Sequence, residues 1–238
     1  MEGKPFTSFI IRLLDIIFSA IGLIITSPII LVVTIILLLT GEHKVFYLQE
    51  RVGKGGKPFK IIKFVTMRSG SEKQGNITLK NDPRVLPFGK FLRKTKINEL
   101  PQLINVLKGD MSLVGWRAQT YDIFSHFTPD VQQALKKIRP GVSGIGPVMF
   151  RSEEELLDPK KVPDPRKFYL EVLTPYKGYV EKWYVDNYSI KNYLLIIFCT
   201  ILIVLFPKST LHMKLFKNVP TPPQEILKIK ALANVSDE

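Results

Sequence analysis

The chain of 238 residues contains a single cysteine, Cys199, and fewer acidic than basic side chains. One cysteine excludes an intrachain disulfide framework and a zinc site built from several thiolates. A disordered chain is excluded for most of the length, because 45% hydrophobic residues can build a packed core. Lys and Arg number 34 against 21 Asp and Glu, so the formal net charge is +13. A chain that is both hydrophobic and basic favours a protein bound to an anionic membrane.

Long hydrophobic runs are scarce, and a chain with only two of them does not resemble a polytopic membrane protein. The first run covers residues 9–39 and is long enough to cross a bilayer, since a spanning helix needs about 20 apolar residues. It could form one tilted helix, or Pro28 could break it into two arms that return to the same face. Pro28 lacks an N–H, and Ser27 could donate to the carbonyl that is freed. Basic residues such as Arg12 and Lys44 flank both ends, so we predict the re-entrant hairpin, with its bend at Ser27 and Pro28.

The second hydrophobic run, residues 194–206, is too short to span a bilayer comfortably. We expect it to lie in the membrane interface, to be buried, or to pack against a second copy in a homodimer. The sequence then divides into three parts: a membrane anchor over residues 1–40, a main domain with interfacial helices over 41–206, and a C-terminal tail over 207–238.

The middle of the chain is strongly basic. Residues 41–110 carry 15 Lys and Arg against 6 Asp and Glu, a local net charge of 15 − 6 = +9. Nucleic acid is not the expected partner, because the sequence has no zinc finger, RNP-like aromatic pattern or helix-turn-helix. An anionic lipid or a phosphorylated substrate fits better beside a membrane anchor, although the charge could also be an ordinary solvated face near acidic headgroups.

The secondary structure expected for this region is α+β and predominantly helical. Residues 45–48 and 59–65 read as two strands joined by a Gly- and Lys-rich turn, which predicts a small β-hairpin. Leu100, Leu103, Ile104 and Leu107 then recur at helical spacing, and Gly109 is a good C-terminal stop. Amphipathic and interfacial helices would surround a basic site.

Pro101 fits only the first turn of that helix, which would put Asn98 near its N-cap and Glu99 in its first turn. A helix N-terminus suits a phosphate, so Arg93 and Lys94 could converge with it on one anion. Asn98 has a plain alternative interpretation as a helix cap.

A further Gly- and Pro-rich segment, residues 139–147, begins at Arg139. It could cradle a phosphate, or it could be a rigid connector, and the residues themselves do not decide between the two.

Several motifs follow one another in a characteristic order. They are Gln49-Glu50-Arg51-Val52-Gly53, Pro58-Phe59-Lys60, Asn81-Asp82-Pro83-Arg84, Gly89 to Thr95, Glu99 to Gly115, Arg139-Pro140-Gly141 and Tyr184 to Ser189. This order resembles the bacterial sugar transferase family, the monotopic polyprenyl-phosphate phosphoglycosyl transferases, over residues 7–206. The block 81–115 is the most specific part of the resemblance.

The resemblance implies a definite activity. A UDP-sugar would donate a phosphosugar to undecaprenyl phosphate, giving a polyprenyl diphosphosugar and UMP, the first committed step of a surface glycan such as an exopolysaccharide. Mg²⁺ is the implied cofactor. The family is anchored by a re-entrant hairpin at the cytoplasmic face of the bacterial plasma membrane, with a Ser-Pro pair at the bend that Ser27 and Pro28 match.

The resemblance also implies roles for individual residues. Asn98 and Glu99 would stand at the catalytic pair, and Glu99 would hold Mg²⁺, with Asp110 as a second ligand. Arg93 and Arg117 are the first candidates to hold phosphates. Lys63 and Arg84 are weaker candidates for phosphate or substrate binding, and the residue patterns described above add Lys94 and Arg139.

Two positions depart from the family pattern. Asn98-Glu99 stands where the family has Asp-Glu, whose Asp attacks the β-phosphate, and an amide is a poor nucleophile and a weak metal ligand. Trp116-Arg117-Ala118 replaces Pro-Arg-Pro. Three explanations stay open: an inactivated variant of an active enzyme, a member that uses Glu99 or direct attack by the lipid phosphate, and a membrane-bound homologue that binds lipid phosphate or sugar nucleotide without turnover.

Overall fold

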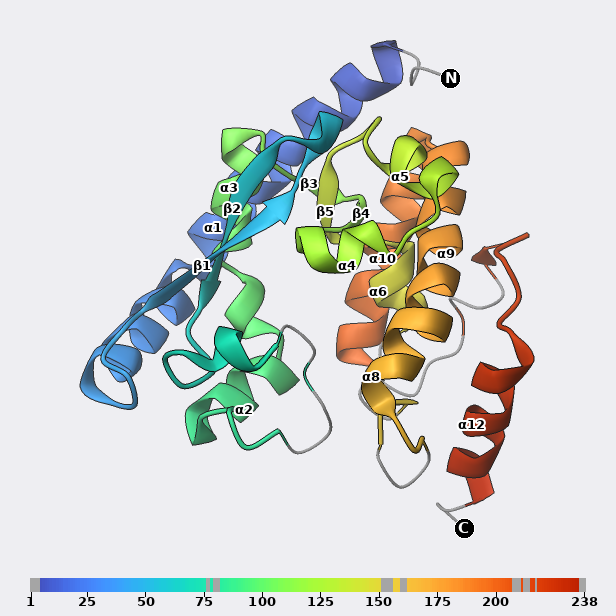
Figure 1. Ribbon diagram of the computed structural model, residues 1–238. Coiled ribbons are helices and arrows are strands. Elements are labelled where there is room, and N and C mark those ends of the chain that lie inside the picture. The colour runs from blue at the N-terminus through green and yellow to red at the C-terminus, as the bar shows by residue number, and fades with distance from the viewer. Residues whose placement is uncertain are drawn as a thin grey trace.

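A computed structural model describes residues 5–75, 78, 82–150, 156–158, 162–206, 211, 215–216 and 218–235. Helices dominate and surround two small sheets, which confirms the predicted α+β class with a long apolar N-terminal helix (Figure 1). The strands are β1 Phe46–Val52, β2 Pro58–Phe64, β3 Ser112–Val114, β4 Trp116–Arg117 and β5 Pro140–Ser143. The helices are α1 Pro5–Leu39, α2 Pro87–Lys94, α3 Gln102–Lys108, α4 Tyr121–Ser125, α5 Pro129–Leu135, α6 Ile145–Met149, α8 Pro165–Phe168, α9 Thr174–Asp186, α10 Ile190–Leu205 and α12 Gln224–Val235.

The first hydrophobic run forms α1 as one helix that continues through Pro28, so the predicted two-armed hairpin is not what the structure has. Pro28 leaves the Ile24 carbonyl without its usual N–H donor. The Ser27 hydroxyl donates to this same Ile24 carbonyl at 2.8 Å, which is the local repair expected from the sequence. The Thr26 hydroxyl adds a bond to the Gly22 carbonyl at 2.6 Å. With these carbonyls satisfied, the helix passes Pro28 without a break.

One face of α1 packs onto the rest of the protein along the length of the helix. Ile11, Asp15 and Ser19 are buried near its beginning, and Val33 and Leu37 near its end. The other faces leave large apolar side chains exposed: Phe6, Phe9, Leu13, Ile17, Ile24, Leu31, Ile35 and Leu39. Within the described part of the chain, α1 is the single helix long and apolar enough to cross a membrane. An apolar surface of this size marks an interaction site, and the length of α1 suggests a membrane.

The predicted β-hairpin is confirmed and is somewhat longer than expected. β1 and β2 pair antiparallel, from Phe46 opposite Phe64 to Val52 opposite Pro58. The connecting turn contains Gly55 and Gly56 at φ 69° and 78°, a left-handed conformation that glycine adopts without strain. In Figure 1 the hairpin lies across α1, and its Phe64 packs in one cluster with residues from the end of α1.

The Gly- and Pro-rich segment forms a strand and a short helix, and a phosphate role for it stays a prediction. Its residues form β5, the central strand of a parallel sheet in the order β3-β5-β4, and then α6. A Cβ added at Gly141 would lie 2.1 Å from the Gly115 backbone nitrogen, so this close approach of two strands requires glycine. The sheet brings the loop after β3 against the start of β5, which places Arg117 beside Gly141.

Trp116 explains one departure from the family pattern. It is fully buried, packs against Phe124, and donates from its indole nitrogen to the Ile138 carbonyl at 3.3 Å. A proline at this position would have no N–H for the β4–β5 ladder. Where the family has the first proline, this chain therefore has a residue that pairs in β4 and packs in an aromatic cluster with Phe124.

The second hydrophobic run forms α10, which is half-buried as its length suggested. Tyr193, Ile196 and Cys199 face the core, while Phe198 and Ile201 on the opposite side are about half exposed. The described part of the tail packs back onto this core. Ile226 of α12 is fully buried, and the Tyr176 hydroxyl of α9 donates to the Pro220 carbonyl at 2.9 Å.

Candidate functional site

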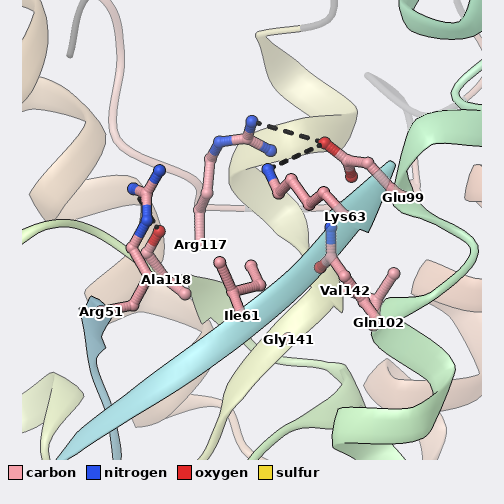
Figure 2. Close-up of a pocket in the computed structure, with 9 residues that line it drawn as sticks. All are labelled: Arg51, Ile61, Lys63, Glu99, Gln102, Arg117, Ala118, Gly141 and Val142. Carbon is pink, nitrogen blue, oxygen red and sulfur yellow. Dashed lines mark hydrogen bonds and ion pairs between the residues drawn. The ribbon is translucent and has the colours of Figure 1, made fainter. Parts of the chain in front are cut away.

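A small pocket gathers the charged residues of the middle region and is called here the Glu99 pocket (Figure 2). Its lining comes from both strands of the hairpin, the turn before α3, and the strands β4 and β5. The lining residues are Arg51, Ile61, Lys63, Glu99, Gln102, Arg117, Ala118, Gly141 and Val142. Figure 2 shows Arg51 at one side, Glu99 at the other, and Lys63 and Arg117 pointing toward the Glu99 carboxylate.

Glu99 reaches this pocket from a 3₁₀ turn, Ile97–Glu99, rather than from the first turn of an α-helix. Lys96 adopts a left-handed φ of 61° after α2 and reverses the chain. α3 then begins at Gln102, with Pro101 as its N-cap, so the prediction that Asn98 lies near the N-cap was wrong. The predicted end of the helix is confirmed, because Gly109 follows α3 at φ 90°.

Two cations hold the Glu99 carboxylate. Lys63 Nζ lies 3.5 Å from Glu99 Oε1, and Arg117 Nη2 lies 3.8 Å from the same oxygen. The side chains of Lys63 and Glu99 are only 18% and 16% exposed, so water screens this pair weakly. Burial raises the pKa of Glu99, but Lys63 and Arg117 outweigh it and lower this pKa to about 2. Glu99 is therefore an anion at every physiological pH.

The cations of the pocket are buried close together, and they repel one another electrostatically. Burial lowers the pKa of Lys63 to about 8, against the raising effect of Glu99. Burial, followed by repulsion from Arg117, lowers the pKa of Arg51 to about 10. Arg51 Nη1 donates to the Ala118 carbonyl at 3.1 Å, while its Nε is buried with no partner among the described residues. A further anion in the pocket would relieve this repulsion.

The sequence predictions for binding residues divide into two groups. Lys63, Glu99 and Arg117 come together in the pocket, although the first and last are separated by more than fifty positions in the sequence. Arg93 lies close enough to lower the pKa of Lys63, and Lys94 is exposed at the end of α2. Neither is part of the pocket lining, and their phosphate role stays a prediction.

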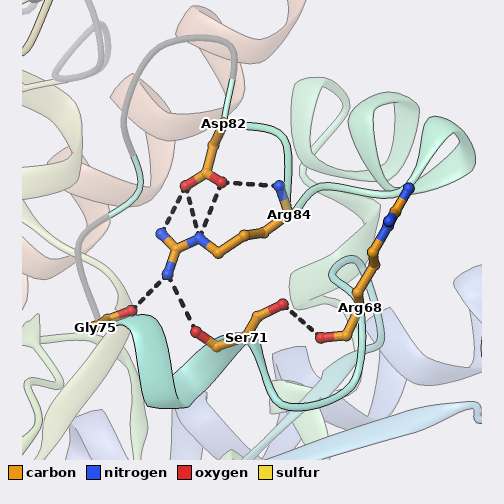
Figure 3. A network of polar contacts seen from close by, with 5 residues as sticks. All are labelled: Arg68, Ser71, Gly75, Asp82 and Arg84. Atoms are coloured by element: carbon orange, nitrogen blue, oxygen red, sulfur yellow. Dashed lines mark hydrogen bonds and ion pairs between the residues drawn. The ribbon is translucent and has the colours of Figure 1, made fainter.

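Arg84 lies in a different network (Figure 3). Its Nε and Nη2 bond to the Asp82 carboxylate at 2.9 Å and 2.6 Å, and its Nη1 donates to the Ser71 and Gly75 carbonyls at 3.1 Å and 2.8 Å. Asp82 also accepts from the backbone N–H of Arg84 at 3.0 Å. This arrangement ties the loop before α2 together, and it commits most of the guanidinium to structure.

Asp110 and Arg139 also lie outside the Glu99 pocket. Asp110 follows α3 and accepts from the Asn105 amide at 3.3 Å, so it stands at the opposite end of that helix from Glu99. The whole of α3, about 10 Å of helix, lies between the two residues in the chain. Arg139 donates from Nε to the Gly109 carbonyl at 2.7 Å. Within the described ranges, no three His, Cys, Asp or Glu side chains converge on one point.

Comparison with known proteins assigns the chain to a family. A family profile described as bacterial sugar transferase matches residues 6–207. The chain belongs to the bacterial sugar transferase family. The resemblance read from the motifs is thereby confirmed.

Relatives of this sugar transferase carry related names. A candidate undecaprenyl-phosphate N-acetylgalactosaminyl 1-phosphate transferase of Bacillus subtilis (strain 168) is 51% identical over 131 residues, which are 55% of this chain and 73% of the relative. An Aeromonas hydrophila protein named UDP-N-acetylgalactosamine-undecaprenyl-phosphate N-acetylgalactosaminephosphotransferase is 34% identical over 205 residues, which are 85% of this chain and 45% of that protein. The undecaprenyl-phosphate galactose phosphotransferase of Salmonella typhimurium (strain LT2) is 33% identical over 219 residues, or 85% of this chain and 42% of its own. The sugar transferase thus spans less than half the length of the last two relatives.

Asn98 of the sugar transferase is buried beside Glu99. Its side-chain oxygen Oδ1 has no hydrogen-bond partner in the part of the chain that the structure describes. An orphaned buried carbonyl is costly, so such a group usually belongs to a functional site or meets a ligand. The cap interpretation fails here, because no backbone N–H of α3 bonds to this oxygen among the described residues.

Arg51, Gln102 and Glu181 are polar residues at the site that the sequence predictions missed. Arg51 belongs to the first motif of the chain, and this motif was the only sequence feature that could have marked it as a site residue. Glu181, on α9, accepts from the Arg117 backbone N–H at 3.1 Å through Oε1. Its other oxygen is buried with no partner among the described residues. Glu181 therefore fixes the backbone of the residue whose guanidinium contacts Glu99.

Glu181 predicts a pH dependence of stability. Burial raises its pKa from 4.5 to about 7, against the lowering effect of the Arg117 N–H. Between these two values the unfolded chain loses its proton first, so the free energy of unfolding should fall as pH rises, by about 3 kcal/mol in total. Glu181→Gln has no such proton to lose. Unfolding curves in a mild detergent should show wild type weakening from pH 5 to pH 8 more than the variant does, and equal slopes would contradict the assignment.

Proposed function

We propose that the protein transfers a phosphosugar from a UDP-sugar to undecaprenyl phosphate and releases UMP, the first committed step of a surface glycan. The observation that carries this proposal is the Glu99 pocket, in which Lys63 and Arg117 hold one carboxylate and Arg51 adds a third cation. The names of the relatives support undecaprenyl phosphate as acceptor. They differ in the sugar, so the proposal names a UDP-sugar without choosing among them.

The charge of the pocket suits a diphosphate. Three cations against one carboxylate leave a net positive charge, and both substrates carry phosphates. Phosphoryl transfer relies mainly on positioning and on neutralising the equatorial oxygens, for which arginine forks and ammonium groups are well matched. In this proposal Arg117 and Lys63 bind the phosphates, while Glu99 keeps both side chains oriented before the substrate arrives.

Mg²⁺ is the cofactor we propose, and the residues of the pocket fit it in part. Mg²⁺ prefers oxygen ligands and is usually bound by one or two carboxylates together with substrate phosphates. Among the described residues, Glu99 is the one carboxylate that lines the pocket, and the orphaned Asn98 Oδ1 is a second oxygen on the adjacent residue. Glu99 would hold the ion, which would neutralise charge on the diphosphate when bound. The geometry does not support Asp110 as a second ligand.

Glu99 is a poor candidate for the attacking group, because its ion pairs with Lys63 and Arg117 lower its pKa and its nucleophilicity. An amide at position 98 is no better. We therefore propose direct transfer. An oxygen of the acceptor lipid phosphate forms a bond to the β-phosphorus of the UDP-sugar, and the bond from that phosphorus to the bridging oxygen breaks. The electron pair leaves with UMP, whose charge Arg117 and Lys63 compensate.

We also propose that the protein sits on one leaflet, at the cytoplasmic face of the bacterial inner membrane. α1 has 35 residues and is about 52 Å long, far more than the roughly 30 Å hydrocarbon core. A helix that packs along its length onto a polar domain cannot cross a bilayer while that domain stays in water. The exposed apolar side chains of α1, together with those of α10, would enter the membrane, and the net charge favours an anionic surface.

Asn98 favours a second candidate function, in which the protein binds these substrates without catalysing the transfer. To separate the two, the protein is placed in lipid with undecaprenyl phosphate, Mg²⁺ and a panel of UDP-sugars, and UMP is measured. The proposal predicts acceptor-dependent UMP release by wild type and little change in Asn98→Asp. Release by Asn98→Asp alone would instead assign wild type to the non-catalytic class.

A further inference from the structure

A second pocket lies beside the first turns of α1 and shares no lining residue with the Glu99 pocket. It is called here the α1 pocket. Its charged lining comes from α1, from the hairpin turn and from the segment between α5 and β5: Arg12, Asp15, Lys54, Lys137 and Arg139. Four cations therefore surround one carboxylate in a place where the proposed reaction has no use for them.

The single carboxylate of the α1 pocket is already engaged by neutral donors. Asp15 accepts from the Ser112 hydroxyl at 2.9 Å, the Leu113 N–H at 2.8 Å and the Tyr193 hydroxyl at 2.8 Å. These bonds hold its charge at the floor of the pocket. An anion would consequently bind nearer the rim, where the lysines lie.

The two arginines are only partly used. Arg12 donates to the Val106 and Leu107 carbonyls at 2.6 Å and 2.8 Å, and so satisfies the C-terminal end of α3. Arg139 donates only through Nε, to Gly109. Its two terminal nitrogens have no hydrogen-bond partner in the described part of the protein, which leaves one edge of the guanidinium available for a phosphate.

The two lysines are held near one another by the backbone. Lys54 lies in the turn of the β-hairpin, and Lys137 directly follows the end of α5. The Gly55 N–H donates to the Lys136 carbonyl at 2.8 Å and ties these two loops together. Neither lysine forms an ion pair within the described ranges. Four cations outnumber the Asp15 carboxylate in this lining, and a bound anion would lower their mutual repulsion.

The position of the α1 pocket selects the kind of anion. Phe6 and Phe9 on the same turns of α1 are 71% and 66% exposed, so the pocket opens beside an apolar surface fit for a membrane. A cluster of Lys and Arg next to such a surface binds anionic lipid headgroups. We propose that the α1 pocket binds the phosphate of an anionic phospholipid and fixes the depth and tilt of α1 in the leaflet.

The test measures lipid retention. Purified full-length protein in a neutral detergent is incubated with phosphatidylglycerol or phosphatidylcholine, and bound lipid is counted by native mass spectrometry. The double variant Lys54→Gln, Lys137→Gln should bind phosphatidylglycerol about thirtyfold more weakly than wild type. The matched control, Lys60→Gln with Lys73→Gln, removes the same charge from exposed positions outside both pockets. It should retain the lipid as wild type does.

Three results would overturn the proposal. One is equal loss of lipid in the double variant and the control, which would mean that net charge alone drives binding. Another is equal retention of phosphatidylcholine. The last is complete displacement by millimolar inorganic phosphate, which would make the ligand a soluble phosphate. UMP release, assayed on the same samples, reports on the proposed function separately, so failure of one proposal does not obscure the other.

Discussion

Glu99→Gln should lower the rate of UMP release about a thousandfold. The change keeps the size of the side chain but removes the charge that orients Lys63 and Arg117, and with it the proposed ligand for Mg²⁺. The substrate would then meet Lys63 and Arg117 without the carboxylate that orients them. Initial rates at saturating UDP-sugar and acceptor lipid measure this effect directly.

The matched control for this variant is Glu50→Gln. Glu50 is exposed on β1 next to Arg51, and because successive strand residues point to opposite faces, it lies on the side away from the pocket. Its replacement should change the rate by less than about twofold. If Glu99→Gln retains more than a tenth of the wild-type rate while remaining folded, Glu99 does not have the role proposed here.

Asp15→Ala should lower the free energy of unfolding by about 4 kcal/mol. Asp15 joins three elements, because it accepts hydrogen bonds from Ser112 and Leu113 of β3 and from Tyr193 of α10. Its removal leaves these donors buried without a partner. The expected result is a protein whose α1 detaches from the domain before the rest unfolds.

Asp15→Asn provides the control for this second prediction. The asparagine keeps an acceptor oxygen of the same size, so its effect should be about half as large. Chemical unfolding in detergent, followed by tryptophan fluorescence, compares the variants, since Trp116 is buried in the domain core. A loss below about 1 kcal/mol in Asp15→Ala would show that apolar packing alone holds α1.

Local sequence patterns predicted the elements that local forces determine. The hairpin follows from two β-prone runs around a glycine turn, and the end of α3 follows from Gly109. The donation from Ser27 to a freed carbonyl was also predictable, because it depends on neighbouring residues of one helix. The network of Arg84 with Asp82 is local as well, and a spacing of two residues across a turn was an available signal for it.

Tertiary contacts decided the rest. The domain holds α1 near both of its ends through segments far away in the sequence, and no local pattern predicts these contacts. The Gly- and Pro-rich segment became a central strand through pairing with β3 and β4, which composition cannot reveal. Glu181 reaches the site from α9, more than sixty positions after Arg117, without any motif of its own.

The candidate site shows the same division. The family resemblance named Lys63, Glu99 and Arg117, and the fold brings these residues to one pocket. Asp110 and Arg139 were also predicted as site residues, although the fold places them around the C-terminal end of α3. A motif shows which residues the chain contains. Which of them meet in space depends on how β2, β4 and the turn before α3 pack together.

The central claim is that a phosphosugar, rather than a sugar alone, moves from the UDP-sugar to the lipid. The most direct measurement uses a UDP-sugar radiolabelled in its β-phosphate, with wild-type protein in vesicles that contain undecaprenyl phosphate. We expect the label to enter the lipid fraction in step with the release of unlabelled UMP. Label that remains in a water-soluble nucleoside diphosphate or sugar phosphate, with none in the lipid, would contradict it.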